Sequence, residues 1–89
     1  MKESKIENEV CKYAKNLDWL CYKFSSPGNK AVPDRIFLKQ GVIVFIEFKS
    51  TGKQPSKLQA KVIKRIRDEE FKVYVIDNVT EGYQVFEQF

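Results

Sequence analysis

The pattern of apolar and polar positions divides the chain into helical and extended segments. From about Glu3 to Leu17, apolar residues recur at helical spacing, with Ile6 and Val10 on one face, which predicts an amphipathic helix. Glu7 lies at the edge of that apolar stripe. Four shorter apolar runs predict strands. They are WLCYKF (19–24), DRIFLK (34–39), VIVFIEFK (42–49) and KVYVI (72–76).

A second helix is predicted between the third and fourth strands, from Pro55 as its first residue to about Glu70. The apolar positions expected to face the sheet are Leu58, Val62, Ile63 and Ile66. The tail YQVFEQF, residues 83–89, is expected to form a short strand or a packed C-terminal segment. The order is α-β-β-β-α-β plus a tail. The expected fold class is therefore α/β, one domain over residues 1–89 with a mixed sheet flanked by helices.

The connection between the second and third strands sets their register. Gln40 and Gly41 form a two-residue hairpin turn, with the glycine in a left-handed conformation. Counting outward from this turn places Asp34 directly opposite Glu47. Opposed residues of an antiparallel pair share a face, with Cβ atoms about 4.5–5.5 Å apart. Lys49 has the same parity as Glu47 and points to that face too.

This pairing predicts a metal site at the end of the hairpin. Two carboxylates at such a distance repel each other unless a cation lies between them, and Mg²⁺ or Mn²⁺ suits hard oxygen ligands. The backbone carbonyl of Phe48 is a further candidate ligand, and Lys49 is a candidate for orienting or activating a water molecule. Taken singly, Asp34 is also interpretable as a turn residue and Glu47 as a strand-end residue paired with Lys49. The combination P-D, twelve residues, E-x-K favours the metal site.

The composition excludes several kinds of catalytic site. The chain has no histidine, which excludes histidine-based zinc sites and imidazole general bases. Any hydrolysis must therefore use carboxylates, lysine and a hard cation. Cys11 and Cys21 are expected to be reduced core residues rather than a disulfide. No apolar run approaches the length of a membrane span, and the N-terminus lacks the apolar region of a signal peptide, so we expect an intracellular protein without membrane contact.

Several of these motifs together resemble one family. VPDRIFL, VIVFIEFKS and GKQPSKLQ, with KIENEV before them and FKVYVID after them, are similar to the VRR-NUC family of the PD-(D/E)xK nuclease superfamily. The likeness covers nearly the whole chain, as in stand-alone phage and bacterial members. It implies a PD-(D/E)xK nuclease core that cleaves DNA with Mg²⁺ or Mn²⁺ and without a small-molecule cofactor. It also implies branched or junction DNA as the substrate, a role in replication, repair or recombination, and a cytoplasmic location.

The resemblance assigns roles to individual residues. It implies that Asp34 and Glu47 are metal-binding carboxylates and that Lys49 is the catalytic lysine. Gln59 matches a glutamine that such proteins carry near the site. Glu7 matches a helix glutamate that supports the metal directly or through water.

Two positions fit the family pattern less well. Glu3 is a weaker candidate than Glu7 for supporting the metal, because it lies near the fraying terminus. Ala31 stands where a glycine is expected. If that position has a positive φ, alanine would strain the loop.

The formal net charge of +4 is consistent with a polyanionic partner. Basic residues give affinity for a phosphate backbone without sequence readout. The candidates are Lys30, Arg35, Lys53, Lys57, Lys61 and Lys64. Lys30 and Lys53 are favoured because both lie in loops that flank the predicted site. Tyr22, Phe24 and the terminal aromatics are expected in the core rather than as stacking platforms for bases.

The sequence leaves three functions open. The first is a metal-dependent endonuclease, and the small size of the chain together with the family likeness favours a homodimer that presents two sites to a junction. The second is a non-catalytic nucleic-acid-binding or adaptor module with a nuclease-like fold. The third is a structural domain in which Glu47 and Lys49 form a surface salt bridge of little energetic weight.

Overall fold

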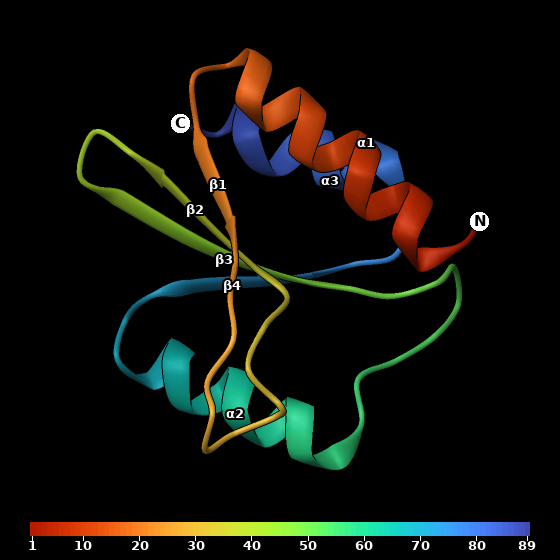
Figure 1. The fold of residues 1–89 in the computed structure, drawn as a ribbon, viewed down its shortest axis with the longest axis vertical. Helices are drawn as coiled ribbons and strands as arrows, with labels where there is room; N and C mark the ends of the chain where they lie inside the picture. The colour runs from red at the N-terminus through yellow and green to blue at the C-terminus, as the bar shows by residue number, and fades with distance from the viewer.

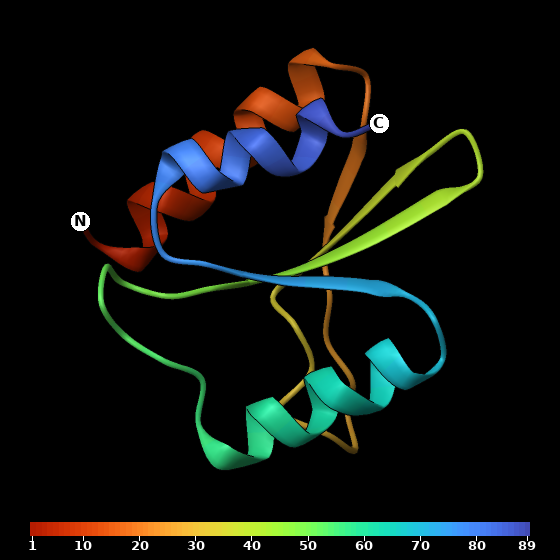
Figure 2. The same ribbon diagram turned by 180° about the vertical axis from the view of Figure 1, so that it is seen from behind.

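A mixed four-stranded sheet separates the helices into two layers. The computed structural model describes residues 1–89, and the strands lie in the order β1-β2-β3-β4. Their bounds are β1 Leu20–Lys23, β2 Arg35–Lys39, β3 Val42–Phe48 and β4 Lys72–Ile76. Helices α1 (Glu3–Asn16) and α3 (Val79–Glu87) lie side by side on one face, and α2 (Lys57–Asp68) lies on the other (Figures 1 and 2). The predicted α/β class with a mixed sheet is confirmed.

The register predicted from the turn is also confirmed. β2 and β3 pair antiparallel from Lys39 opposite Val42 to Arg35 opposite Ile46. Gln40 and Gly41 both have positive φ, at 47° and 82°, as a tight hairpin turn requires. β4 then pairs parallel to β3, which α2 makes possible by carrying the chain back across the sheet.

The main core lies between the sheet and the α1–α3 layer. Ile6 and Val10 of α1 are fully buried there, against Phe37, Val44 and other apolar side chains of the sheet. Burial of such side chains supplies most of the stability of the fold, at about 1.5–3 kcal/mol each. Because β3 side chains alternate, residues 44, 46 and 48 enter this core, and residues 43, 45 and 47 face the α2 side.

The start of α2 differs from the prediction. Ser56 is the N-cap, and Pro55 precedes it rather than being the first helical residue. The hydroxyl of Ser56 accepts a hydrogen bond from the backbone N–H of Gln59, which satisfies one free donor of the first turn. Val62 and Ile63 are buried as expected, whereas Leu58, also expected to face the sheet, is 58% exposed in the first turn of the helix.

The C-terminal segment forms a helix, so the prediction of a short strand was wrong and that of a packed segment was right. Asn78 caps α3 by accepting from the backbone N–H of Glu81. Gly82 lowers helix propensity in the middle of this short segment. Its missing side chain nevertheless lets α3 approach Val10 of α1 closely, so tertiary packing outweighs the local propensity.

Three smaller expectations are settled by the backbone and by burial. Ala31 is buried and does not have a positive φ, so the expected strain is absent. Cys11 and Cys21 are free thiols, the first buried and the second half-buried. Tyr22, expected in the core, is 55% exposed on the edge strand β1.

None of the three helices is sufficiently long and apolar to span a membrane.

Candidate active site

The predicted carboxylates meet where β2 and β3 end. Asp34 immediately precedes β2, and its Oδ2 accepts a hydrogen bond of 2.8 Å from the backbone N–H of Phe48, the last residue of β3. The carbonyl of Asp34 accepts from the N–H of Phe24, 2.9 Å away, which ties the same residue to the end of β1. Asp34 is therefore held by strands on both sides of β2.

Glu47 is the buried charged residue of the fold, with 2% of its surface exposed. Its Oε2 accepts from Lys49 Nζ at 3.1 Å and from Gln59 Nε2 at 3.0 Å. Both contacts are made on the α2 side of the sheet, as the alternation along β3 predicts. Since Lys49 and Glu47 have side chains only 15% and 3% exposed, the interpretation of this pair as a surface salt bridge is wrong.

Burial raises the pKa values of both carboxyls, and neighbouring carboxylates add to each shift. For Glu47 the larger cause is desolvation, followed by the negative charge of Asp34, and Lys49 opposes both. For Asp34 the causes that raise the pKa are desolvation and the nearby Glu3 and Glu7, while the hydrogen bond from Phe48 lowers it. Both shifts disfavour the ionised carboxylates, and a cation at this position would favour them.

Gln59 joins helix α2 to the acidic pair. Its Oε1 accepts from the backbone N–H of Ser56 at 2.9 Å, which completes a capping box with the Ser56 hydroxyl. Its Nε2 is thereby directed to Glu47. The glutamine was predicted near the site only from the family likeness, and the S-x-x-Q spacing in SKLQ is the local signal that would have predicted its cap.

Glu7 and Arg35 are brought together, a pairing that the sequence reasoning missed. Arg35 Nε donates to Glu7 Oε2 at 2.6 Å, and the two side chains are 14% and 19% exposed. Arg35 Nη1 also approaches Cys21 Sγ at 3.9 Å. Arg35 was considered only as a phosphate contact, and Glu7 only as support for a metal. The residues are 28 positions apart, so no local spacing signals this pair.

The acidic residues do not form a ready-made metal cage. Nowhere in residues 1–89 do three or more His, Cys, Asp or Glu side chains gather closely enough to hold an ion by themselves. Glu7 therefore does not join Asp34 and Glu47 in one cluster. Two carboxylates, a carbonyl and waters are nevertheless an ordinary donor set for Mg²⁺, which keeps several of its waters. The unbalanced negative charge of the pair fits such an ion.

The lysines predicted to contact DNA lie in two loops and on helix α2. Lys30 lines a cavity of about 300 Å³ together with Asp34, at the loop between β1 and β2. Lys53 is exposed in the loop between β3 and α2, and Lys57 and Lys61 are exposed on α2. Lys64 pairs with Asp68 at 2.8 Å on the exposed face of the same helix. Lys30 is thus the predicted basic residue that shares a cavity with Asp34.

The three-layer fold and the paired P-D and E-x-K residues define a PD-(D/E)xK nuclease core. No family model matches the chain. A search of curated proteins finds "Putative nuclease p44" of Acyrthosiphon pisum secondary endosymbiont phage 1, which is 33% identical over 79 residues that cover 88% of this chain and 85% of that protein. The chain therefore belongs to a family of nucleases.

Two solved structures share the fold over the whole chain. One, described as a VRR_NUC domain, has a TM-score of 0.91 and 25% identity, and the match covers 100% of this chain and 98% of the other. A second, described as a VRR_NUC domain protein, has a TM-score of 0.80 and 16% identity, with 100% and 88% covered. The family resemblance inferred from the sequence motifs is confirmed.

Proposed function

We propose that this protein is a divalent-metal-dependent endonuclease that hydrolyses DNA phosphodiester bonds. The observation that carries the proposal is the buried Glu47, which lies beside Asp34 and bonds to Lys49 and Gln59 at the end of a rigid hairpin. A structural domain gains nothing from two carboxyls whose pKa values are raised by burial and repulsion. Perturbed groups of this kind are typical of catalytic sites.

The residues present fit Mg²⁺ or Mn²⁺. Asp34, Glu47 and the backbone carbonyl of Phe48 would hold the ion, and Glu7, which is paired with Arg35, would support it through water. The chemistry supplied by such an ion is charge neutralisation at the phosphate and acidification of a nearby water molecule. The N–H of Phe48 holds one oxygen of Asp34, and Gln59 holds one oxygen of Glu47, so both carboxylates keep a fixed orientation.

Lys49 is proposed to act on the attacking water. Its ammonium group lies 3.1 Å from Glu47 and is mostly shielded from solvent, so its position is restricted. From there it can donate a hydrogen bond to the water or to a phosphate oxygen. A charge fixed before the reaction stabilises the negative charge that develops on the phosphate without any cost of reorganisation.

DNA is the proposed substrate, with branched or junction DNA preferred, in replication, repair or recombination. Lys30, Lys53, Lys57 and Lys61 are exposed around the site and suit a phosphate backbone. Arg35 is different, because its guanidinium group is already paired with Glu7. We therefore propose that Arg35 holds Glu7 in place rather than contacting DNA.

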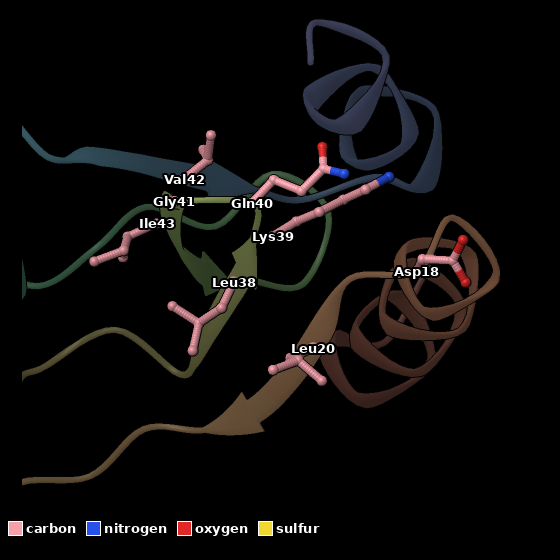
Figure 3. A pocket seen from close by; sticks show the side chains of 8 residues that line it. All are labelled: Asp18, Leu20, Leu38, Lys39, Gln40, Gly41, Val42 and Ile43. Carbon is pink, nitrogen blue, oxygen red and sulfur yellow. The ribbon is translucent and has the colours of Figure 1, made fainter.

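A homodimer is proposed through the face of the sheet that α2 leaves open. Leu20, Leu38 and Ile43 stand in one row across β1, β2 and β3 by their strand register, and Tyr22 and Ile36 begin the next row. Figure 3 shows the first row close to the Gln40-Gly41 turn of the hairpin, with Asp18 of the α1–β1 turn farther away at the rim of the cavity that they line. Leu20 and Tyr22 are 53% and 55% exposed. A contiguous apolar surface of this kind on one face marks a contact site, and two copies related by a twofold axis would bury it.

The oligomer has its own test. Leu20→Glu is expected to convert the dimer to a monomer in analytical ultracentrifugation, because a charge would then lie in the apolar contact. Leu58→Glu is the matched control, since Leu58 is 58% exposed on α2, outside the proposed contact. Equal sedimentation of wild type and Leu20→Glu would show that this face is not the interface.

The activity is tested with flap, forked, four-way and plain duplex DNA, each incubated with Mg²⁺, Mn²⁺ or chelator. Metal-dependent cleavage by the wild type is expected, together with its loss in Asp34→Ala and Lys49→Ala. Lys64→Ala serves as a control, because Lys64 belongs to an exposed pair on α2. Cleavage that persists in chelator, or in both site variants, would refute the mechanism. Binding of DNA without any cleavage would favour the non-catalytic module.

A further inference from the structure

A largely apolar hollow of about 410 Å³ lies next to the candidate active site, between the β1–β2 loop, the sheet and α2. Figures 1 and 2 show this loop, coloured orange to yellow, passing beside α2. The lining side chains are Phe24, Asn29, Val32, Phe45, Val62, Arg65, Ile66, Glu69 and Phe71. Three of them are aromatic, so the hollow offers π faces as well as aliphatic surface.

The hollow is continuous with the catalytic centre in two ways. Phe24, Asn29 and Val32 also line the smaller cavity of about 300 Å³ that contains Asp34 and Lys30. Phe45 lies two residues before Glu47 on the same face of β3, which separates them by about 7 Å along the strand. A group attached to the strand being cut can therefore enter the hollow while its phosphate is near Asp34.

The charges of the lining favour an uncharged occupant. Arg65 and Glu69 carry one charge of each sign, and the other seven lining residues are neutral. Lys30 lies outside the hollow, in the cavity that contains Asp34, where it suits a phosphate. The two cavities together thus offer a site for an anion beside a site for a flat, neutral group.

The polar and aromatic groups of the lining fit a nucleobase. The Oδ1 of Asn29 accepts from the backbone N–H of Ala31 at 3.0 Å, while its Nδ2 makes no hydrogen bond within the chain. A side-chain amide N–H is a suitable donor to the ring nitrogens and carbonyl oxygens of bases. The rings of Phe24 and Phe45 lie 5.4 Å apart and at 45°, and together they form an apolar wall. Stacking on such rings is worth about 1–3 kcal/mol per base and does not depend on base identity.

We propose that this hollow binds one unpaired nucleobase of the DNA strand next to the phosphate that is cut. The inference rests on the proposed nuclease function and explains a preference for branched DNA. A base inside a duplex is stacked on its neighbours and paired along its edge, and moving it out costs a few kcal/mol. A base in a flap, a fork or a junction is already unpaired, so it enters at a lower cost.

The test compares two forked DNA molecules with the same phosphates. In one, the unpaired arm carries thymidine, and in the other it carries abasic tetrahydrofuran residues. Binding to the wild-type protein is measured by fluorescence anisotropy in chelator, so that nothing is cut. The expected result is about tenfold weaker binding of the abasic arm, which is the loss of one stacked base. Equal dissociation constants for the two arms would overturn the proposal.

The variant Phe71→Ala tests whether the base binds in the hollow. Phe71 is 45% exposed, so its removal perturbs the core little, and Phe89→Ala is the control because Phe89 is 48% exposed beside Trp19 instead. Phe71→Ala is expected to weaken binding of the thymidine arm severalfold and to leave the abasic arm unchanged. Phe89→Ala is expected to change neither. An equal loss for both arms in Phe71→Ala would show that the hollow does not bind a base.

The outcome separates this inference from the proposed function. Metal-dependent cleavage of forked DNA that requires Lys49, together with equal binding of the two arms, would refute the base site alone. Base-dependent binding without cleavage under any metal would refute the nuclease mechanism and support the base site. Absence of any DNA binding would refute both.

Discussion

The side chain of Gln59 makes two hydrogen bonds whose effects can be separated by substitutions. Its carbonyl oxygen accepts from the N–H of Ser56 in the capping box, and its amide nitrogen donates to the buried carboxylate of Glu47. Gln59→Ala removes both interactions. Ser56→Ala removes the side-chain cap but leaves the Gln59–Glu47 hydrogen bond in place. The two variants therefore distinguish the stability of helix α2 from the orientation of Glu47.

The expected magnitudes follow from the kind of interaction that each variant loses. Loss of an N-cap costs about 1 kcal/mol of stability. A hydrogen bond to a charged group contributes about 1.5–3 kcal/mol. Ser56→Ala should therefore be less stable by about 1 kcal/mol. Gln59→Ala should be less stable by about 3 kcal/mol, the sum of about 1 kcal/mol for its hydrogen bond from the Ser56 N–H and the contribution of its bond to Glu47. For the proposed cleavage, loss of the fixed carboxylate should lower kcat by about 10-fold or more, since about 1.4 kcal/mol corresponds to a factor of ten.

The assay combines urea unfolding with single-turnover cleavage of forked DNA in Mg²⁺. Gln59→Ala should lose both stability and kcat, whereas Ser56→Ala should lose stability and keep kcat within about twofold of the wild type, because the hydrogen bond to Glu47 survives. The cleavage is measured well below the unfolding transition of the weaker variant. If the two variants lose kcat equally, or if Gln59→Ala keeps full activity, Gln59 does not position Glu47.

Three further predictions concern other contacts of the fold and site. Gly82→Ala should lower the free energy of unfolding in urea by about 1–3 kcal/mol, because the new Cβ would overlap Val10. The same substitution made in a Val10→Ala protein should cost less, because the overlapping side chain is then gone. Arg35→Ala should lower the free energy of unfolding by about 2 kcal/mol, because it leaves Glu7 without its partner. The double variant Arg35→Ala with Glu7→Gln should recover part of that loss. Additive losses in the double variant would show that the pair is not coupled. The third prediction concerns pH in the presence of chelator. Burial raises the pKa of Glu47 above its ordinary value of 4.5, so its contribution to stability is full below pH 4.5 and is lost as the pH rises through the raised value. The melting temperature of the wild type should therefore fall relative to that of Glu47→Gln as the pH rises above about 4.5, and parallel curves would contradict the shift.

The central part of the site followed from local rules, which is why the sequence predicted it. A two-residue turn at Gln40-Gly41 sets the register of the hairpin, and the alternation of side chains sets the face. These two rules together bring Asp34 next to Glu47 and place Lys49 on the same side. The physical reason is that a hairpin is a short-range structure, so few alternatives compete with it.

The contacts between distant segments were decided only by the tertiary structure. The pairing of Glu7 with Arg35 depends on how α1 lies across the sheet, and no local spacing determines that angle. Tertiary packing also decided that the C-terminal segment is helical. Helix α3 is stabilised by packing Val85 and Phe86 into the core, despite the glycine in its middle. The hollow beside the site likewise arises where the β1–β2 loop meets α2. The sequence by itself thus determined the pairing of Asp34 with Glu47. The surroundings of this pair required the packing of helices on the sheet, because that packing sums many weak contacts between segments far apart in the chain.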